Sequence, residues 1–565
     1  MSFPQVTARD WRAQVDKELA GVPFEKALVH RTAEGLSIQP LYTERPRGDS
    51  LLVEAPTAQF RVCVRVDAAA GADTIADELA GGADALWLDS AAADLALAVD
   101  GVGRAFLVLE CGSIPPLAQL ERLAARLAPD TAFALGADPF ADVAQGRLAP
   151  AGLAGARDAL VEAALAAERR WPLASVVTVS TLPYHEAGAD AADEIAIAIA
   201  TGAAYLESLV GGGLSPAAAA RQITLRAATG RDTFVEMCKL RALRIAWRKV
   251  LVAAGAVDPP RPLLHAVCSS RTLAQRDPWV NMLRTTTQIF AAVLGGADLV
   301  TPTAFDEALG PASPLGRRVA RNTGLVLREE SVLGKVKDAA AGSYYFDSLT
   351  DALAREGWKR FQGIEREGGI EDALVSGRLR AKIESSWTTW LGRISTRKEG
   401  ILGVSEFANL DEKLPRPARD REAPPAGAAA LPVHHDAAPF EQLRLRADAS
   451  PSRPEAILVA LGPLAESRAR VGFASNLFAA GGIRAREVPR AEAAIIACLC
   501  GSDERYAQEA VDQARALKAA GCRRILLAGR PGPLETALRE AGVDGFLYAG
   551  CDAVALLSEL LDAFR

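Results

Sequence analysis

Over most of the chain, short apolar runs alternate with longer stretches rich in alanine and leucine. Runs such as AFLVLEC and SVVTVS do not alternate between apolar and polar positions, which is typical of strands buried on both faces of a parallel sheet. In the N-terminal part of the chain, such runs predict seven strands, at residues 60–66, 85–89, 105–111, 132–138, 175–180, 263–269 and 299–303.

The segments between these runs, such as residues 117–127 and 187–209, are long enough to form crossover helices. Repeated strand–helix units over about 350 residues favour an α/β fold of the (β/α)₈ TIM-barrel type with additions. An open doubly wound sheet is the structural alternative, because short apolar runs alone do not show whether a sheet closes.

A second alternating pattern occupies the C-terminal part of the chain. Four or five parallel strands within about 110 residues predict a flavodoxin-like doubly wound sheet, which binds ligands at the carboxyl ends of its strands. The apolar runs lie at residues 456–461, 493–499, 524–528 and 545–548, and the helical stretches at 468–480, 506–520, 533–541 and 552–564.

A proline-rich stretch separates the two patterns. Repeated prolines between Asp411 and Pro454, including Pro424 and Pro425, remove backbone donors and predict an extended connector. We therefore expect an N-terminal arm over residues 1–50, a barrel over 51–410, a linker over 411–454 and a small domain over 455–565.

Composition agrees with a folded protein of at least two domains. The chain has 565 residues, of which 50% are hydrophobic and 24% charged. Its formal net charge of −6 offers no general positive field for a phosphate backbone, so no nucleic-acid partner is expected.

The cysteines and histidines point to a reduced compartment without a protein-held metal. None of the eight cysteines forms a C-x-x-C pair, and only five histidines occur, two of them adjacent in the proline-rich stretch. The start of the sequence lacks a secretory pattern and no continuous apolar run approaches the length of a membrane span, so we expect a cytoplasmic protein.

Several blocks carry a resemblance to a known family. Residues 277–298 read DPWVNMLRTTTQIFAAVLGGAD, followed by FDEALG at 305–310 and RVARNT at 318–323. With IQPLYT at 38–43, EAGAD at 186–190 and KLRALRIAW at 239–247, this chain resembles the methylmalonyl-CoA mutases over nearly its whole length.

The resemblance implies an adenosylcobalamin-dependent radical rearrangement of (R)-methylmalonyl-CoA to succinyl-CoA. In that family the barrel holds the acyl-CoA along its axis, and a C-terminal flavodoxin-like domain presents the corrin at the carboxyl end of the barrel. Cobalamin-binding members carry Asp-x-His-x-x-Gly in the first loop of the small domain, where the histidine is the lower ligand of cobalt.

This chain departs from that pattern in the cobalamin loop. The best register places Leu464, Glu466 and Ala469 at the aspartate, histidine and glycine positions, and no histidine occurs from residue 436 to 565. Because cobalt needs a neutral, directed nitrogen donor there, we expect no cofactor-binding residues and no metal ligands on this chain.

The barrel half departs from the family as well. The family's Arg-Pro-Trp-Thr-Ile-Arg-Gln-Tyr segment is missing after Tyr42, and His185 replaces the glutamine that bonds the substrate. His265 keeps a family histidine whose neighbours differ. Both histidines are candidates for a vestigial pocket, either as substrate contacts or as hydrogen-bonded, space-filling residues, and no catalytic residue is expected.

We therefore expect the small (beta), non-catalytic subunit of a heterodimeric methylmalonyl-CoA mutase, with a large catalytic partner subunit that binds adenosylcobalamin and the acyl-CoA. One alternative is an autonomous acyl-CoA mutase without a lower histidine. Another is a binding protein that assists a different cobalamin enzyme, although no nucleotide-binding P-loop is present.

Overall fold

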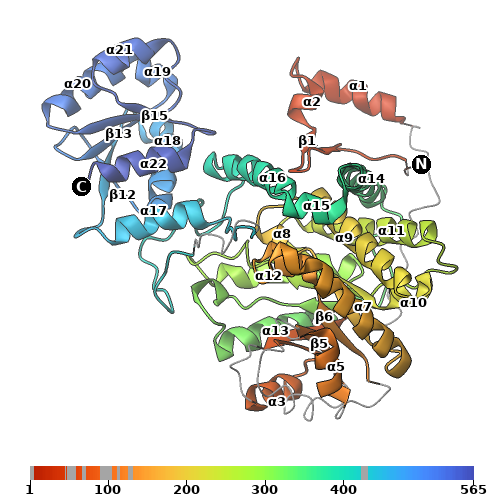
Figure 1. The fold of residues 1–565 in the computed structure, drawn as a ribbon. Coiled ribbons are helices and arrows are strands. Elements are labelled where there is room, and N and C mark those ends of the chain that lie inside the picture. Colours follow the sequence, from red (N-terminus) through yellow and green to blue (C-terminus); the bar gives the residue numbers. More distant parts are fainter. Residues whose placement is uncertain are drawn as a thin grey trace.

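The computed structural model describes residues 6–44, 46, 59–66, 72–89, 105–110, 115–124, 131–421 and 430–564. Figure 1 shows a barrel surrounded by helices and a smaller sheet domain, with α16 and α17 between them. The boundary expected at residue 50 lies outside the described residues, as does the strand end expected at Cys111.

Eight parallel strands close into a barrel in the order β10-β3-β4-β5-β6-β7-β8-β9. This closure confirms the (β/α)₈ expectation, and the alternative of an open doubly wound sheet is wrong. The strands are β3 (Arg61–Val66), β4 (Ala85–Asp89), β5 (Phe106–Glu110), β6 (Phe133–Ala137), β7 (Ser175–Ser180), β8 (Ile223–Thr229), β9 (Leu264–Cys268) and β10 (Leu299–Thr301).

Strand β8 was not among the seven strands that the sequence predicted. It reads ITLRAAT, pairs with β7 and β9, and is buried at every position. Arg226 in its centre interrupts the apolar run, so the pattern of a buried strand is lost although the strand is present.

Helices cover the outside of the barrel, as Figure 1 shows. Those between or directly after the strands are α3 (Ala72–Ala80), α5 (Pro116–Ala124), α6 (Pro139–Ala144), α7 (Leu153–Arg170), α8 (Leu182–Glu186), α9 (Ala191–Gly211), α10 (Pro216–Arg221), α11 (Thr233–Ala253), α12 (Val280–Leu294) and α13 (Pro314–Glu329). They are followed by α14 (Tyr344–Arg366), α15 (Gly369–Val375) and α16 (Arg378–Ser395).

Among the described helices, α9 alone is long and apolar enough to cross a membrane. It packs against α11 and α14, and 67% of its apolar window is buried. An ideal Cβ on Gly357 of α14 would lie 2.5 Å from the Ile195 side chain, so the two helices approach closely. Core packing accounts for the hydropathy of this helix.

The N-terminal arm contains α1 (Ala8–Glu18), α2 (Phe24–Ala27), β1 (His30–Arg31) and β2 (Ser37–Ile38). Helix α1 begins with a capping box between Thr7 and Asp10, yet none of its residues is buried. Its packing is with α2, where Trp11 meets Phe24 edge to face at 6.1 Å. Figure 1 shows this pair of helices projecting from the barrel.

The segment expected to be an extended connector is partly helical. Helix α17 (Ala438–Asp448) lies within it and buries Phe440 and Glu441. The Glu441 carboxylate accepts hydrogen bonds from the backbone and side chain of Gln275 after β9. The expectation of an extended chain is therefore wrong for residues 438–448, because their apolar side chains have a core to join.

The small domain is a five-stranded parallel sheet in the order β12-β11-β13-β14-β15, the flavodoxin-like order 2-1-3-4-5. The edge strand β12 is too polar for its pattern to have indicated a strand. The strands are β11 (Glu455–Ala460), β12 (Arg484–Val488), β13 (Ile496–Cys500), β14 (Arg524–Ala528) and β15 (Gly545–Leu547); the helices are α18 (Leu464–Ala480), α19 (Asp503–Arg505), α20 (Val511–Ala519), α21 (Glu535–Glu540) and α22 (Ala553–Asp562).

Candidate functional site

Side chains from the middle of β4 and β8 and from the first half of β9 meet inside the barrel. Arg226 of β8 is buried, and its guanidinium carbon lies 4.3 Å from the centre of the Trp87 ring of β4. The Arg226 Nε donates to His265 Nδ1 of β9 at 3.3 Å, and the His265 and Trp87 rings meet edge to face at 5.4 Å. The path along which this family holds its acyl-CoA is occupied here by a stacked cation and two rings.

These contacts determine which ring nitrogen of His265 carries the hydrogen. An arginine N–H only donates, so His265 Nδ1 must accept, and the ring hydrogen lies on Nε2, which donates to Thr301 Oγ1 at 2.8 Å. Burial, followed by the charge of Arg226, lowers the pKa of His265 well below its usual value. The ring is therefore neutral, and both of its nitrogens are engaged.

His185 belongs to a different group of buried polar side chains at the mouth of the barrel. Its Nδ1 lies 2.9 Å from Glu194 Oε1 of α9, and its Nε2 lies 2.7 Å from Ser269 Oγ at the end of β9. Lys239 of α11 places its Nζ 2.8 Å from the same Glu194 oxygen. Thr181 donates to the other Glu194 oxygen at 2.5 Å.

The Glu194 carboxylate is ionised within this group. Burial alone raises its pKa, but the charges of Lys239 and His185 and the hydrogen bonds that both donate outweigh burial and lower the pKa to about 2. Because a carboxylate only accepts, His185 Nδ1 carries a hydrogen; in the uncharged form of the ring, Nε2 accepts the Ser269 hydroxyl, and in the charged form it donates to it.

His185 and Ser269 line a small cavity at the carboxyl mouth of the barrel. Its volume is about 60 Å³, and its wall includes Arg65, Trp87 and Thr301. Ser270 and Glu307 belong both to this wall and to the lining of a neighbouring cavity of about 330 Å³.

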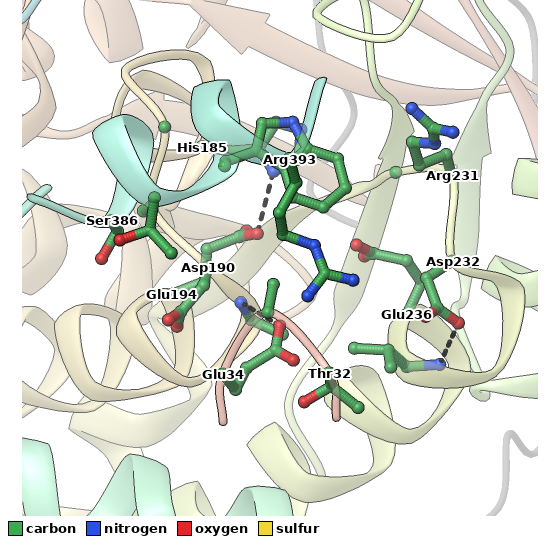
Figure 2. A pocket seen from close by; sticks show the side chains of 18 of the residues that line it. Thr32, Glu34, His185, Asp190, Glu194, Arg231, Asp232, Glu236, Ser386 and Arg393 are labelled. Atoms are coloured by element: carbon green, nitrogen blue, oxygen red, sulfur yellow. Dashed lines mark hydrogen bonds and ion pairs between the residues drawn. The ribbon is translucent and has the colours of Figure 1, made fainter. Parts of the chain in front are cut away.

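A second, larger cavity of about 700 Å³ lies on the other side of His185, outside the barrel axis. One face of α16 lines it with Lys382, Ser385, Ser386, Thr389, Trp390 and Arg393. Figure 2 shows Arg393 extending into this cavity between the walls that carry Glu34 and Glu236. The arm covers one side through residues 30–34.

Glu34 is the arm residue most tightly held at this cavity. Its Oε1 accepts from the backbone of Ala191 at 3.2 Å, while its Oε2 is buried without a hydrogen-bond partner. Burial, followed by the nearby charge of Asp190, raises the pKa of Glu34 to about 7. The carboxyl group is thus poised to change its charge near neutral pH.

The three residues at the cobalamin-loop positions lie in the first two turns of α18, because the helix begins at Leu464 rather than at the expected residue 468. Leu464 and Ala469 are exposed. Leu464 lacks the carboxylate of the aspartate that the family carries at the aligned position, and Ala469 adds a Cβ where the family carries glycine. Glu466 Oε2 accepts from Arg505 Nε of α19 at 2.8 Å. An ion pair therefore forms at the residue that the sequence register predicts to align with the family's lower cobalt ligand.

The neighbouring carboxyl ends of β13 and β14 are also covered. The Tyr506 hydroxyl donates to the carbonyl of Ala528 at 2.7 Å and accepts from the backbone of Gly501 at 2.9 Å. Arg470 of α18 donates to the same Ala528 carbonyl at 2.6 Å. These side chains lie over the carboxyl ends of β13 and β14, and Glu466 beside them is paired with Arg505, so the residues present do not fit a corrin.

Several of these residues were not singled out from the sequence. Arg226 lay in the unrecognised strand β8, and Glu194 and Ser269 lay in segments read only as helix and strand. A charged residue inside an apolar run was the available signal for Arg226. Among the described residues, no group of three or more metal-ligating side chains is placed to hold an ion, and the expected absence of a metal remains a prediction.

A closed (β/α)₈ barrel whose carboxyl-end loops are tied to a flavodoxin-like domain is the architecture of the mutases that the sequence motifs resemble. The methylmalonyl-CoA mutase family model matches residues 133–429, more than half of the chain. This chain belongs to the methylmalonyl-CoA mutase family.

Curated relatives agree with that assignment. A methylmalonyl-CoA mutase small subunit from Streptomyces virginiae is 38% identical over 99% of this chain and 97% of its own length. The small subunit from Propionibacterium freudenreichii subsp. shermanii is 36% identical over 69% of this chain and 63% of its own. A methylmalonyl-CoA mutase from Escherichia coli is 35% identical over 41% of this chain and 33% of its own.

Proposed function

We propose that this chain is the small, non-catalytic subunit of a heterodimeric, adenosylcobalamin-dependent methylmalonyl-CoA mutase. Its large partner subunit binds the cofactor and the acyl-CoA and interconverts (R)-methylmalonyl-CoA and succinyl-CoA. The observation that supports the proposal is the ion pair with Arg505 made by Glu466, the residue that the sequence register aligns with the family's cobalt ligand.

The side chains of the small domain support the placement of the cofactor on the partner subunit. A carboxylate that neutralises an arginine is a poor substitute for the neutral nitrogen donor that cobalt takes from below. Tyr506 and Arg470 close the carboxyl edge beside it. We therefore place adenosylcobalamin on the partner and no cofactor on this chain.

The barrel supports the same conclusion for the substrate. Arg226, Trp87 and His265 pack together inside the barrel, where an acyl-CoA along the axis would have to pass. We therefore assign the acyl-CoA to the large subunit.

The N-terminal arm is our candidate for partner contact. An isolated helix of 11 residues is marginal in water, and α1 has no buried residue in the single chain. Val6 and Val22 are 69% and 49% exposed on the same arm. Burial of these side chains against the large subunit would supply the tertiary packing that α1 lacks. We place the heterodimer in the cytoplasm.

Co-expression with the large subunit tests the proposal. We expect both chains to co-elute in size-exclusion chromatography with corrin absorbance and mutase turnover, and the isolated chain to bind no adenosylcobalamin. Turnover by the isolated chain would instead establish an autonomous mutase. Co-purification with an unrelated cobalamin enzyme, and not with the large subunit, would support an assisting protein.

The contribution of the arm has a matched control on the same helix. Trp11→Ala removes the contact with Phe24 and should weaken co-elution, whereas Gln14→Ala removes only an exposed hydrogen bond to Glu18 and should leave it unchanged. Equal behaviour of the two variants would exclude α1 from the interface.

A further inference from the structure

The group around His185 has the geometry of a nucleophile, a base and an orienting carboxylate. Ser269 Oγ lies 2.7 Å from His185 Nε2, and His185 Nδ1 lies 2.9 Å from Glu194 Oε1. In acyl transfer, these three roles require this order of contacts, with the hydroxyl on one ring nitrogen and the carboxylate on the other. The dashed line from His185 in Figure 2 marks the second contact.

The hydrogen bonds of His185 suit that chemistry. The ionised Glu194 holds a hydrogen of the His185 ring on Nδ1, so in the uncharged form of the ring the Nε2 lone pair faces Ser269. Lys239 lies between Glu194 and Glu236, at 2.8 Å and 2.5 Å, so the carboxylate is fixed from the opposite side. His185 cannot turn without breaking one of two hydrogen bonds.

The nucleophile position faces a space of defined size. Ser269 lines the 60 Å³ cavity at the barrel mouth, and a water-sized group needs about 10–15 Å³ by the same measure. The cavity therefore accepts an acyl group of two or three carbons but not a bulky one. Arg65 lines the same cavity, with its guanidinium carbon 4.7 Å from the centre of the Trp87 ring, and is the cation in the cavity wall.

We propose that Ser269, His185 and Glu194 form an acyl-transfer site that hydrolyses small esters or thioesters. Ser269 Oγ bonds to the carbonyl carbon while its proton passes to His185 Nε2. The bond to the leaving alcohol or thiol breaks, and the leaving group takes that proton. Water then attacks the acyl-serine with the same proton transfers, releases the carboxylic acid and restores Ser269.

This proposal is independent of the partner subunit, so the isolated full chain is the material for its test. p-Nitrophenyl acetate should be hydrolysed and should label Ser269 with its acetyl group, as located by mass spectrometry of the rapidly quenched and digested protein. Absence of the label from Ser269 in the folded wild-type chain would by itself overturn the proposal.

Variants separate this site from general surface reactivity. Ser269→Ala should abolish labelling and reduce ester turnover at least 100-fold, and His185→Gln should slow labelling by a similar factor. Ser270→Ala is the matched control, because the Ser270 hydroxyl donates to Glu186 at 3.2 Å and lies outside the relay. In this variant the labelling of Ser269 should stay within twofold of the wild-type rate.

Glu194 is a positioning residue, so its test is the division between kcat and KM. Glu194→Gln should lower kcat at least tenfold with little change in KM, because the amide no longer favours the Nδ1 hydrogen. Unchanged labelling in His185→Gln, or equal losses in Ser269→Ala and Ser270→Ala, would show that no such relay operates. Melting curves of each variant identify any that fail to fold.

Discussion

Docking of the arm onto the barrel should depend on pH through Glu34. With its partner-free Oε2 buried beside Asp190, this carboxyl has a pKa of about 7 when the arm is docked and near 4.5 when it is free. Arg360 faces the same place and is held by Asp190 and Asp193, so its charge is already balanced. As pH rises, Glu34 therefore loses its proton at a lower pH in the free arm than in the docked arm.

The sign and size of the effect follow from that difference. Between pH 4.5 and about 7 the docked state binds one more proton than the free state, so docking weakens as pH rises. At about 1.4 kcal/mol per pKa unit, the free energy of docking becomes less favourable by about 3 kcal/mol above pH 7, and this loss vanishes below pH 4.5. Glu34→Gln removes the titration and should restore docking at high pH.

Hydrogen exchange of the backbone amides of residues 30–38 measures this docking. After correction for the intrinsic exchange rate, wild-type protection should fall by about 100-fold between pH 5 and pH 8, and Glu34→Gln should show no such fall. Glu44→Gln, an exposed change of the same charge on the same arm, should behave as wild type. Protection that is independent of pH in the wild type would refute the reasoning.

Three further outcomes follow from the packing. Arg226→Ala opens a cavity on the barrel axis and should lower the free energy of unfolding by about 3 kcal/mol, read from a denaturant midpoint. Gly136→Ala should lower the free energy of unfolding by at least about 3 kcal/mol, because Gly136 has φ +75° and an added Cβ would lie 1.8 Å from a backbone oxygen. In the same assay Gly155→Ala, on an open helix face, should raise the free energy of unfolding by up to about 1 kcal/mol. Glu466→Ala should change stability by less than about 1 kcal/mol, since its pair with Arg505 is partly exposed, and should yield no corrin absorbance after incubation with adenosylcobalamin.

The sequence predicted the architecture well where buried strands were apolar throughout. Strands β5 and β7 were clear because no charge interrupts them, and their positions agree with the prediction within one residue or two. Strands β8 and β12 were missed because Arg226 and the polar positions of Arg484–Val488 depend on neighbours distant in sequence. Tertiary contacts, rather than local pattern, decide such strands.

The candidate site was predictable by residue type but not by arrangement. The family pattern drew attention to His185 and His265 as a pair, yet the structure assigns them to two separate groups with different partners. Glu194 and Ser269 lie 75 residues apart in sequence and have no shared motif. Their meeting at one imidazole depends on the parallel order β7-β8-β9, which brings the ends of β7 and β9 to the same mouth on either side of the unpredicted strand β8.

His265 shows why a retained family residue does not imply a retained function. A histidine acts on a thioester carbonyl only if one ring nitrogen is available to the substrate. Here Arg226 donates to Nδ1, and that single contact forces the hydrogen onto Nε2 and into its bond with Thr301. Burial, followed by the charge of the same guanidinium, lowers the pKa of the ring, and the guanidinium packs on Trp87 inside the barrel. One buried arginine on an unrecognised strand thus occupies a ring nitrogen of the histidine, adds to the effect of burial on its pKa and takes up space inside the barrel.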